Sequence, residues 1–500
     1  MKTVCKLLCV LLLLSAILVA VNAADELEDV IIESCLSGRS ADLSGFKITE
    51  TALDNTFQKL LESGKLPWYT TGQYSYTYEE DTGIIQEFTP ENLPESYDRD
   101  LYEQKLADLM SRCIHPGMTD LEIALSVHDT LILIGQYDET LNKNTPYDLL
   151  IDGTSVCAGY TDLYRDILNR AGVPCVSVNS EAMEHTWNLV QLGDNWYHVD
   201  LTWDDPTPDI YGSVKHEYFL LTDEQISSGS KTHYGWSTTI TCSDDQYRLA
   251  YWRLVESPVI FPGDGYAYYL KTQELSYQVM KRELSSGTEA VIFEEKKPTV
   301  LDFGEGSYTY YHTGLSYWDG ALYVGTLNKI HALDMEGNSQ VVYEYDTAKN
   351  SRYVYSCYVQ EDVIYMVTAT HDGDFGTDEA TLTVSQEQLS QRHTHNYVQT
   401  LKAVATCTTP GYVTYACDCG LTYQSGWTLL EHSFRETTAD GLNTREACTV
   451  CGLTRITGTL ELVPADESID SDDRTTLYVT ASAAAIGGVV GLFSKKRKRS

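Results

Sequence analysis

Basic residues are scarce in this chain. Its 500 residues include 35 lysines and arginines against 72 aspartates and glutamates, and the formal net charge is −37. A surface this acidic repels nucleic acid and other polyanions, so we expect no nucleic-acid partner. The charge suits solubility outside a cell or a cationic substrate. Hydrophobic residues are not scarce: at 43% they argue against a chain that is disordered throughout.

The two ends of the chain carry targeting signals. Residues 1–23 combine two lysines, an apolar run and a small-residue cleavage site, typical of a secretory signal peptide; an uncleaved anchor is the alternative. Residues 477–494 are uncharged and just long enough to span a membrane. The basic tail, residues 495–500, is a stop-transfer signal. We expect a single-pass protein of the cell membrane with an extracellular body and an acidic linker at 457–476; a soluble amphipathic tail is the alternative.

The number of cysteines in the exported body is odd. Two of the 13 cysteines lie in the signal segment, which leaves eleven. Outside the cell most cysteines pair, so at least one thiol should remain free if the others are paired. Catalysis is one reason to keep a free thiol.

Residues 24–95 form a mixed N-terminal segment. Residues 96–245, which follow it, have the clearest pattern of helices and strands and are predicted to form one domain. Helical spacing of apolar residues begins near residue 101, and a capping box at Thr119 opens a second helix. His128 on that helix is interpreted as a packed histidine rather than a ligand. A third helix is expected at about 156–171. Strands follow at 175–178, 186–192 and 196–202, the last two joined by a hairpin turn at 193–195.

Residues 246–390 have the pattern of a β-rich domain. Three similar strand segments, at 265–270, 320–325 and 362–367, recur at intervals near the period of propeller blades. Three units are too few to close a propeller, so we expect an open, blade-like β domain.

Residues 393–456 form a small cysteine-rich module with a degenerate two-unit repeat. Closely spaced cysteines can hold tetrahedral zinc, and outside the cell they can equally form disulfides. Both alternatives stay open for Cys407, Cys417, Cys419, Cys448 and Cys451.

Three short motifs carry the chemistry of a cysteine nucleophile. Cys157 lies at the start of the third expected helix, where unpaired N–H groups and the helix dipole favour a thiolate and can stabilise an oxyanion. His185 begins a strand and can serve as general base and acid. Asp200, on the next strand, can orient the imidazole. We predict Cys157, His185 and Asp200 as a catalytic triad.

The hairpin sets whether His185 and Asp200 can meet. A two-residue turn puts both side chains on one face of the sheet, and a three-residue turn separates them. Simple pairing across the hairpin does not put His185 directly opposite Asp200, so a bulge or strong twist is needed to bring them together. Asp204 would lie on the same face as Asp200 and is an alternative partner for His185. Further candidates for the substrate pocket are Trp187 and Trp203 as walls, and Tyr147 or Asn188 as a second oxyanion donor.

In order and spacing these motifs resemble the transglutaminase-like superfamily, and most closely its bacterial surface members. The resemblance rests on Val-Cys157-x-Gly-Tyr, His185-x-Trp-Asn and Asp200-x-Thr-Trp, and is supported by residues 172–175, 218–224 and His233. It covers about residues 100–245. It implies an α+β, papain-like fold and acyl transfer at an amide through a thioester. The superfamily includes peptidases, crosslinking enzymes and members that have lost activity.

Taken together, the sequence predicts an extracellular cysteine enzyme that cleaves or transfers peptide or glutamine-type amides. Its partner is a protein or peptide substrate, for which a cell-wall peptide is one candidate. The catalysis needs no cofactor, and zinc is expected only as a structural ion in the cysteine-rich module. The main alternative is an inactive surface adhesin or cell-wall-binding protein. A third hypothesis makes the distal domains a stalk that holds the catalytic domain away from the membrane.

Overall fold

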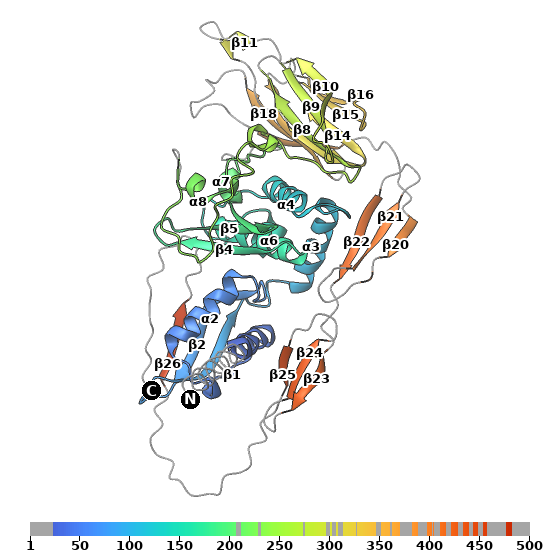
Figure 1. The fold of residues 1–500 in the computed structure, drawn as a ribbon. Coiled ribbons are helices and arrows are strands. Elements are labelled where there is room, and N and C mark those ends of the chain that lie inside the picture. Colours follow the sequence, from blue (N-terminus) through green and yellow to red (C-terminus); the bar gives the residue numbers. More distant parts are fainter. Residues whose placement is uncertain are drawn as a thin grey trace, which may run out of the picture. The chain divides into compact units, whose positions relative to one another are not determined.

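The computed structural model describes residues 24–206, 212–228, 232–273 and 276–296, and between 301 and 482 mainly strands with their nearest turns. Figure 1 shows its helices and strands with their labels. The chain divides into two compact units. One comprises residues 1–99, 405–410 and 429–500, and the other comprises residues 100–404 and 411–428. The predicted signal peptide lies outside the described residues.

The first unit contains a four-stranded sheet with strand order β1-β3-β2-β26. Its elements are a helix over residues 24–37, β1 (Ala41–Asp42), a short 3-10 helix (Ser44–Phe46), α2 (Glu50–Glu62), β2 (Thr70–Tyr78), β3 (Ile85–Asn92) and β26 (Leu477–Ser482). In β2 the rings of Tyr74 and Tyr76 are both buried, in a core that they share with Phe57 and Phe88.

Strand β26 corrects part of the prediction for the C-terminal segment. Residues 477–482, expected to begin a membrane-spanning helix, pair antiparallel with β2, from Gln73↔Ser482 to Tyr78↔Leu477. The segment is rich in aromatic and β-branched residues, which favour strands, and β2 offers it an edge. Residues 483–494 lie outside the described residues. Among the helices that the structure describes, none is long and apolar enough to cross a membrane.

The region of the predicted triad combines helices with an antiparallel sheet of order β4-β5-β6-β7. The helices are α3 (Arg99–Cys113), α4 (Asp120–Ile134), α5 (Pro146–Asp152), α6 (Cys157–Arg170), α7 (Leu201–Asp204) and α8 (Asp223–Ile226). The strands are β4 (Cys175–Ser180), β5 (His185–Leu192), β6 (Asn195–Val199) and β7 (Phe219–Leu221). The predicted capping box at Thr119 opens α4. The expected mixture of helices and antiparallel strands is confirmed.

The hairpin between β5 and β6 has a two-residue turn. Leu192 pairs with Asn195, so the turn residues are Gly193 and Asp194. Gly193 has φ 61°, which glycine adopts without strain. The pairing is regular, without the bulge that the sequence seemed to require. Strand β6 ends at Val199 rather than at residue 202, because the chain turns into α7.

The β-rich region consists of small antiparallel sheets. They are β10-β9-β8, β13-β14-β15-β16 and β17-β18-β19, with a two-stranded pair β11-β12. The three recurring segments fall in different sheets, in β8 (Tyr266–Thr272), β14 (Ala321–Gly325) and β18 (Val363–Thr370). The other strands are β9 (Ser276–Glu283), β10 (Glu289–Lys296), β11 (Leu301–Asp302), β12 (Ser307–Tyr308), β13 (Leu315–Trp318), β15 (Lys329–Leu333), β16 (Ser339–Glu344), β17 (Arg352–Gln360) and β19 (Thr383–Gln388). Their blade-like arrangement stays a prediction.

The two halves of the cysteine-rich module each form a three-stranded antiparallel sheet. The strands are β20 (Val398–Lys402), β21 (Gly411–Ala416), β22 (Thr422–Thr428), β23 (Phe434–Ala439), β24 (Thr444–Cys448) and β25 (Thr454–Thr457). The side chain of Cys448 and the other four candidate metal or disulfide cysteines lie outside the described residues, so that prediction stays open.

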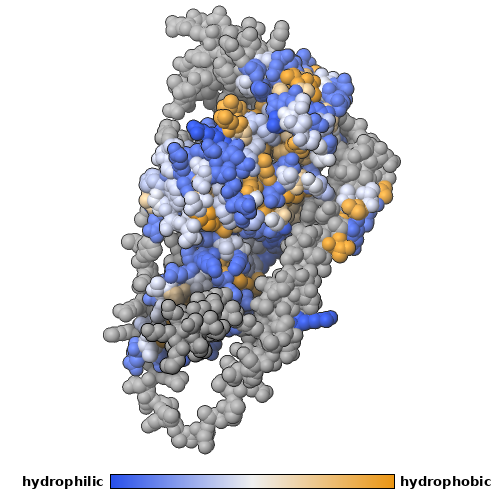
Figure 2. All heavy atoms as spheres, viewed as in Figure 1, coloured by the Kyte–Doolittle hydropathy of each residue, from blue (hydrophilic) through white to orange (hydrophobic). Residues whose placement is uncertain are grey.

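On the face drawn in Figure 2, the described residues are largely hydrophilic, with groups of hydrophobic side chains between them. Beneath it, the cysteines of the described part do not pair. Six of them, all buried, are free thiols: Cys35, Cys113, Cys157, Cys175, Cys242 and Cys357. A free thiol therefore does not by itself single out Cys157; its neighbours do.

Candidate active site

Cys157 is the first residue of α6, and its side chain is almost buried, at 4% exposed. The first N–H groups of a helix have no partner within the helix, and they favour negative charge nearby. Gly159 allows a close approach of the chain at the start of this helix. A Cβ there would lie 2.1 Å from Ser155 Oγ and 2.6 Å from the Thr145 carbonyl oxygen, so glycine lets the start of α6 pack against the preceding loop.

His185 connects Cys157 to Asp200. Its Nε2 lies 2.6 Å from Asp200 Oδ2, which leaves Nδ1 as the ring nitrogen for the Cys157 sulfur. Burial opposes the charged imidazole, but Asp200 and a hydrogen bond with Cys157 outweigh it and raise the pKa of His185 to about 10. The site thus favours an imidazolium next to sulfur, the state that stabilises a thiolate.

Asp200 is fixed through both of its carboxylate oxygens. Oδ1 caps α7 by accepting from the backbone N–H groups of Thr202 and Trp203, at 3.0 and 3.3 Å. Oδ2 accepts from His185 and, at 2.8 Å, from His233 Nε2. Burial disfavours the charged carboxylate, but the two histidines outweigh it and hold the pKa of Asp200 well below its usual range. Asp200 is therefore a carboxylate at neutral pH.

His233 is a site residue to which the sequence motifs assigned no role. It is fully buried, and its Nδ1 has no hydrogen-bond partner in the described structure. Its ring contacts Trp203 at a centroid distance of 4.2 Å and Trp187 at 4.6 Å. It lies 33 residues beyond Asp200 in a loop, where no local pattern indicates a contact; only the family resemblance drew attention to it.

The two predicted wall tryptophans do lie against the histidine. The rings of Trp187 and Trp203 stack on His185, with centroids 5.7 and 5.6 Å away and interplanar angles of 21° and 28°. Trp187 is fully buried, and its indole N–H donates to His198 Nδ1 at 2.9 Å. Such packing restricts the imidazole to one orientation and excludes water from it.

Three other residues that the sequence suggested for the site make different contacts. Asn188 is on the opposite face of β5 from His185, and its amide donates to the Thr161 carbonyl at 3.0 Å, so it is not placed as an oxyanion donor. The rival acid Asp204 contacts His128 rather than His185, because α7 turns it toward α4. Tyr147 lies in α5 with its ring stacked on Tyr102, at 6.5 Å between centroids, and its role as a donor stays a prediction.

Tyr137 is a second residue that the sequence did not indicate. It follows α4 and forms a parallel bridge with Ser155, two residues before the nucleophile. Burial and the charges of Cys157, Asp138 and Asp200 all raise the pKa of Tyr137, which keeps its hydroxyl protonated. A half-buried phenol beside a nucleophilic sulfur can donate to an oxyanion.

Three groups of described residues have the donor types and spacing for a metal ion: His128, Asp129 and His216; His185, Asp200 and His233; and His198, Asp223 and Cys242. The second contains two triad residues. In each group histidine nitrogens already contact carboxylate oxygens, at 2.6 to 3.0 Å. In each group, the histidine nitrogens that face the carboxylates are therefore already engaged in hydrogen bonds or ion pairs. The expectation that catalysis needs no cofactor stays a prediction.

Comparison with known proteins gives a distant, partial similarity. No protein-family model matches the chain. It is 26% identical over 141 residues to the kyphoscoliosis peptidases of Mus musculus and Homo sapiens, covering 23% of this chain and 21% of each relative. The chain thus spans about a fifth of the length of these curated relatives. A solved structure described as a TGase aligns with 26% of this chain and 44% of its own, at 13% identity and a TM-score of 0.18. Part of the chain is therefore distantly similar to a peptidase.

Proposed function

We propose that this protein is a cysteine enzyme that cleaves peptide or glutamine-type amide bonds through a thioester on Cys157. One observation carries the proposal: a buried thiol at a helix N-terminus contacts His185, which Asp200 holds at 2.6 Å through the far ring nitrogen. The distant similarity to a peptidase and the sequence resemblance to transglutaminase-like enzymes support the same chemistry.

The proposed reaction begins with proton transfer from the Cys157 thiol to His185 Nδ1. The thiolate attacks the amide carbonyl carbon, and N–H groups of the first turn of α6 stabilise the oxyanion. The C–N bond then breaks as His185 returns the proton to the leaving amine. Water attacks the thioester, giving up a proton to His185, and the acid product leaves as the proton returns to sulfur. An amine in place of water would give transfer instead of hydrolysis.

The setting of this activity is part of the proposal. The leader-like start and the net charge of −37 support an extracellular body that acts on protein or peptide substrates. Cationic peptides and cell-wall peptides are the candidates to screen first, because an acidic surface attracts positive charge.

The test is the rate at which Cys157 of the full chain is alkylated, measured against pH with peptide mapping. Burial raises the pKa of Cys35, Cys113, Cys242 and Cys357 to about 12, so these thiols are internal controls for slow reaction. We expect fast alkylation of Cys157 well below the free-thiol pKa of about 8.5, lost in His185→Gln and kept in His331→Gln. An ordinary thiol titration, unchanged by His185→Gln, would reject the enzyme and favour the adhesin.

A further inference from the structure

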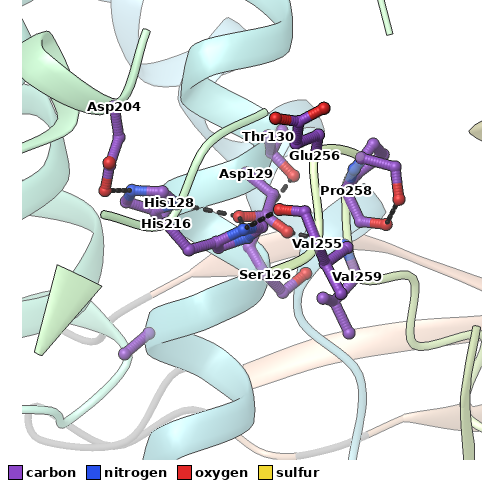
Figure 3. Close-up of polar contacts among 12 residues, drawn as sticks. Ser126, His128, Asp129, Thr130, Asp204, His216, Val255, Glu256, Pro258 and Val259 are labelled. Atoms are coloured by element: carbon purple, nitrogen blue, oxygen red, sulfur yellow. Dashed lines mark hydrogen bonds and ion pairs between the residues drawn. The ribbon is translucent and has the colours of Figure 1, made fainter. Parts of the chain in front are cut away.

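His128 lies in α4 between two carboxylates and is fully buried. Its Nδ1 is 2.8 Å from Asp129 Oδ1, and its Nε2 is 3.2 Å from Asp204 Oδ2 (Figure 3). An ionised carboxylate can only accept hydrogen bonds, so with Asp129 and Asp204 both ionised both ring nitrogens of His128 carry protons. Burial raises the pKa of Asp204, and its hydrogen bond with His128 acts in the opposite direction. The geometry therefore describes an imidazolium between two acidic groups.

Asp204 is connected to the predicted triad through the short helix α7. Helix α7 has four residues: Asp200 caps its start, and Asp204 is its last residue. Asp204 Oδ1 also accepts from the Tyr218 N–H at 2.9 Å, so both of its oxygens are engaged. The acid of the triad and the acid that His128 holds are thus the two ends of one helical turn. A turn this short is not stable by itself and depends on such contacts.

The other end of the network is anchored to a different segment. Asp129 Oδ1 accepts from His216 Nε2 at 3.0 Å, and its Oδ2 accepts from the Val259 N–H at 2.7 Å. His216 Nδ1 in turn donates to the Val255 carbonyl at 3.0 Å. Figure 3 shows these side chains converging between α4 and residues 255–259. His128 is therefore held on one side by a rigid anchor and contacts α7 on the other.

We propose that His128 is a positioning residue of the active site: its hydrogen bond to Asp204 fixes α7 and thereby the orientation of Asp200 toward His185. This inference rests on the proposed function. Breaking the His128–Asp204 contact lets α7 rotate about its cap. The Asp200 carboxylate then moves off the line of the His185 N–H, and the imidazole loses its fixed tautomer.

Two amide substitutions at His128 distinguish a positioning role in the active site from a contribution to the stability of the fold alone. In His128→Gln the amide nitrogen can take the place of Nε2 and keep the contact with Asp204. In His128→Asn it can take the place of Nδ1, keep Asp129 and lose Asp204. Both variants remove one charge and one hydrogen bond, and asparagine also leaves more unfilled space, so the Tm of each variant is measured beside its rate.

The experiment measures Cys157 alkylation against pH in the full chain. We expect His128→Gln to stay within about threefold of the wild-type rate at pH 7. We expect His128→Asn to be about 10- to 100-fold slower, the scale of a misplaced catalytic group. Asp204→Asn should follow His128→Asn. Equal rates in His128→Asn and the wild type would overturn the inference, as would equal losses in both variants accompanied by equal losses in Tm.

A second measurement keeps the inference separate from the proposed function. The low-field proton resonance of His185 Nε2–H, observed with labelled histidine, reports the contact with Asp200 without requiring a reactive thiol. We expect it to persist in His128→Gln and to shift or vanish in His128→Asn. If the wild-type thiol is ordinary but the resonance behaves in this way, the proposed function fails and the positioning role stands. An unchanged resonance in His128→Asn overturns the positioning role.

Discussion

His185 donates to Asp200 at 2.6 Å although the two residues are not partners across the β5–β6 hairpin. The register pairs Asn188 with Val199, so the position opposite Asp200 is Trp187. The offset of two residues is bridged because β6 ends at Val199 and Asp200 turns out of the strand to cap α7. The contact therefore depends on a helix cap rather than on the sheet, and this dependence leads to the predictions below.

Asp200→Asn should abolish the activation of Cys157. An asparagine can still cap α7, but it does not stabilise the imidazolium that forms when His185 takes the thiol proton. We expect the alkylation rate of Cys157 at pH 7 to fall by about 100-fold or more. Asp264→Asn is the control, because Asp264 bonds to Tyr268 in the β-rich region. A rate within a few-fold of the wild type would show that Asp200 has no part in activating the thiol.

His233→Phe should both raise the pKa of Asp200 and lower the free energy of unfolding. It removes one of the two histidine donors to Asp200, so the pKa of Asp200 should rise toward its ordinary value. The loss of a buried hydrogen bond to a charged group should cost about 1–3 kcal/mol in the free energy of unfolding, measured by urea denaturation. His233→Gln, which can keep the Nε2-like donor, should recover most of this loss. If the glutamine variant is as unstable as the phenylalanine variant, the hydrogen bond alone does not account for the stabilisation by His233.

Tyr137→Phe should separate two steps of the reaction. Alkylation forms no oxyanion, so its rate at Cys157 should stay within about twofold of the wild type. Amide hydrolysis does form an oxyanion, and loss of one donor should lower kcat by about 10- to 100-fold. Parallel alkylation and hydrolysis assays with a peptide substrate would measure both rates. An equal fall in the two would mean that Tyr137 affects the thiol instead.

The buried histidines predict that stability falls at alkaline pH. Burial opposes the charged ring, but Asp129 and Asp204 raise the pKa of His128 to about 9, and the pKa of His185 rises to about 10. A histidine with a raised pKa stabilises the fold fully below its unfolded value of about 6.5, and this stabilisation is lost as the pH rises through the folded value. For His128 the loss should be at most about 3 kcal/mol.

Urea denaturation at pH 6.5 and pH 9.5 measures this loss. His128→Gln should show a smaller fall in the free energy of unfolding between the two values, because glutamine does not titrate. Equal falls in the two proteins would contradict the role assigned to the His128 charge.

Local sequence patterns predicted the parts of the site that lie on regular elements. Cys157 was expected at the start of a helix and starts α6. The sequence left two turn lengths open for the hairpin, and the register shows the two-residue turn that puts His185 and Asp200 on the same side. The capping box at Thr119 predicted where α4 begins. These features follow from interactions between residues a few positions apart, so they can be read from spacing alone.

Contacts across long loops were not predictable in this way. His233 reaches Asp200 from 33 residues away, and His128 reaches Asp204 across 76. Nothing in the spacing of these residues distinguishes a histidine in the active site from one packed in a helix. The sequence also favoured a helix at residues 477–482, where pairing with β2 gives a strand instead.

The sequence by itself determined the acidic character of the chain, the order of its elements and the presence of a cysteine, histidine and aspartate in a motif-like order, because these depend only on composition and short spacing. The tertiary structure decided which acid contacts His185, which histidines share the carboxylates of Asp200 and Asp204, and that the Asn188 amide donates to the Thr161 carbonyl. The physical reason is that a short helix, α7, turns its two end carboxylates toward different elements. Its orientation is set by packing between segments that are distant in the chain.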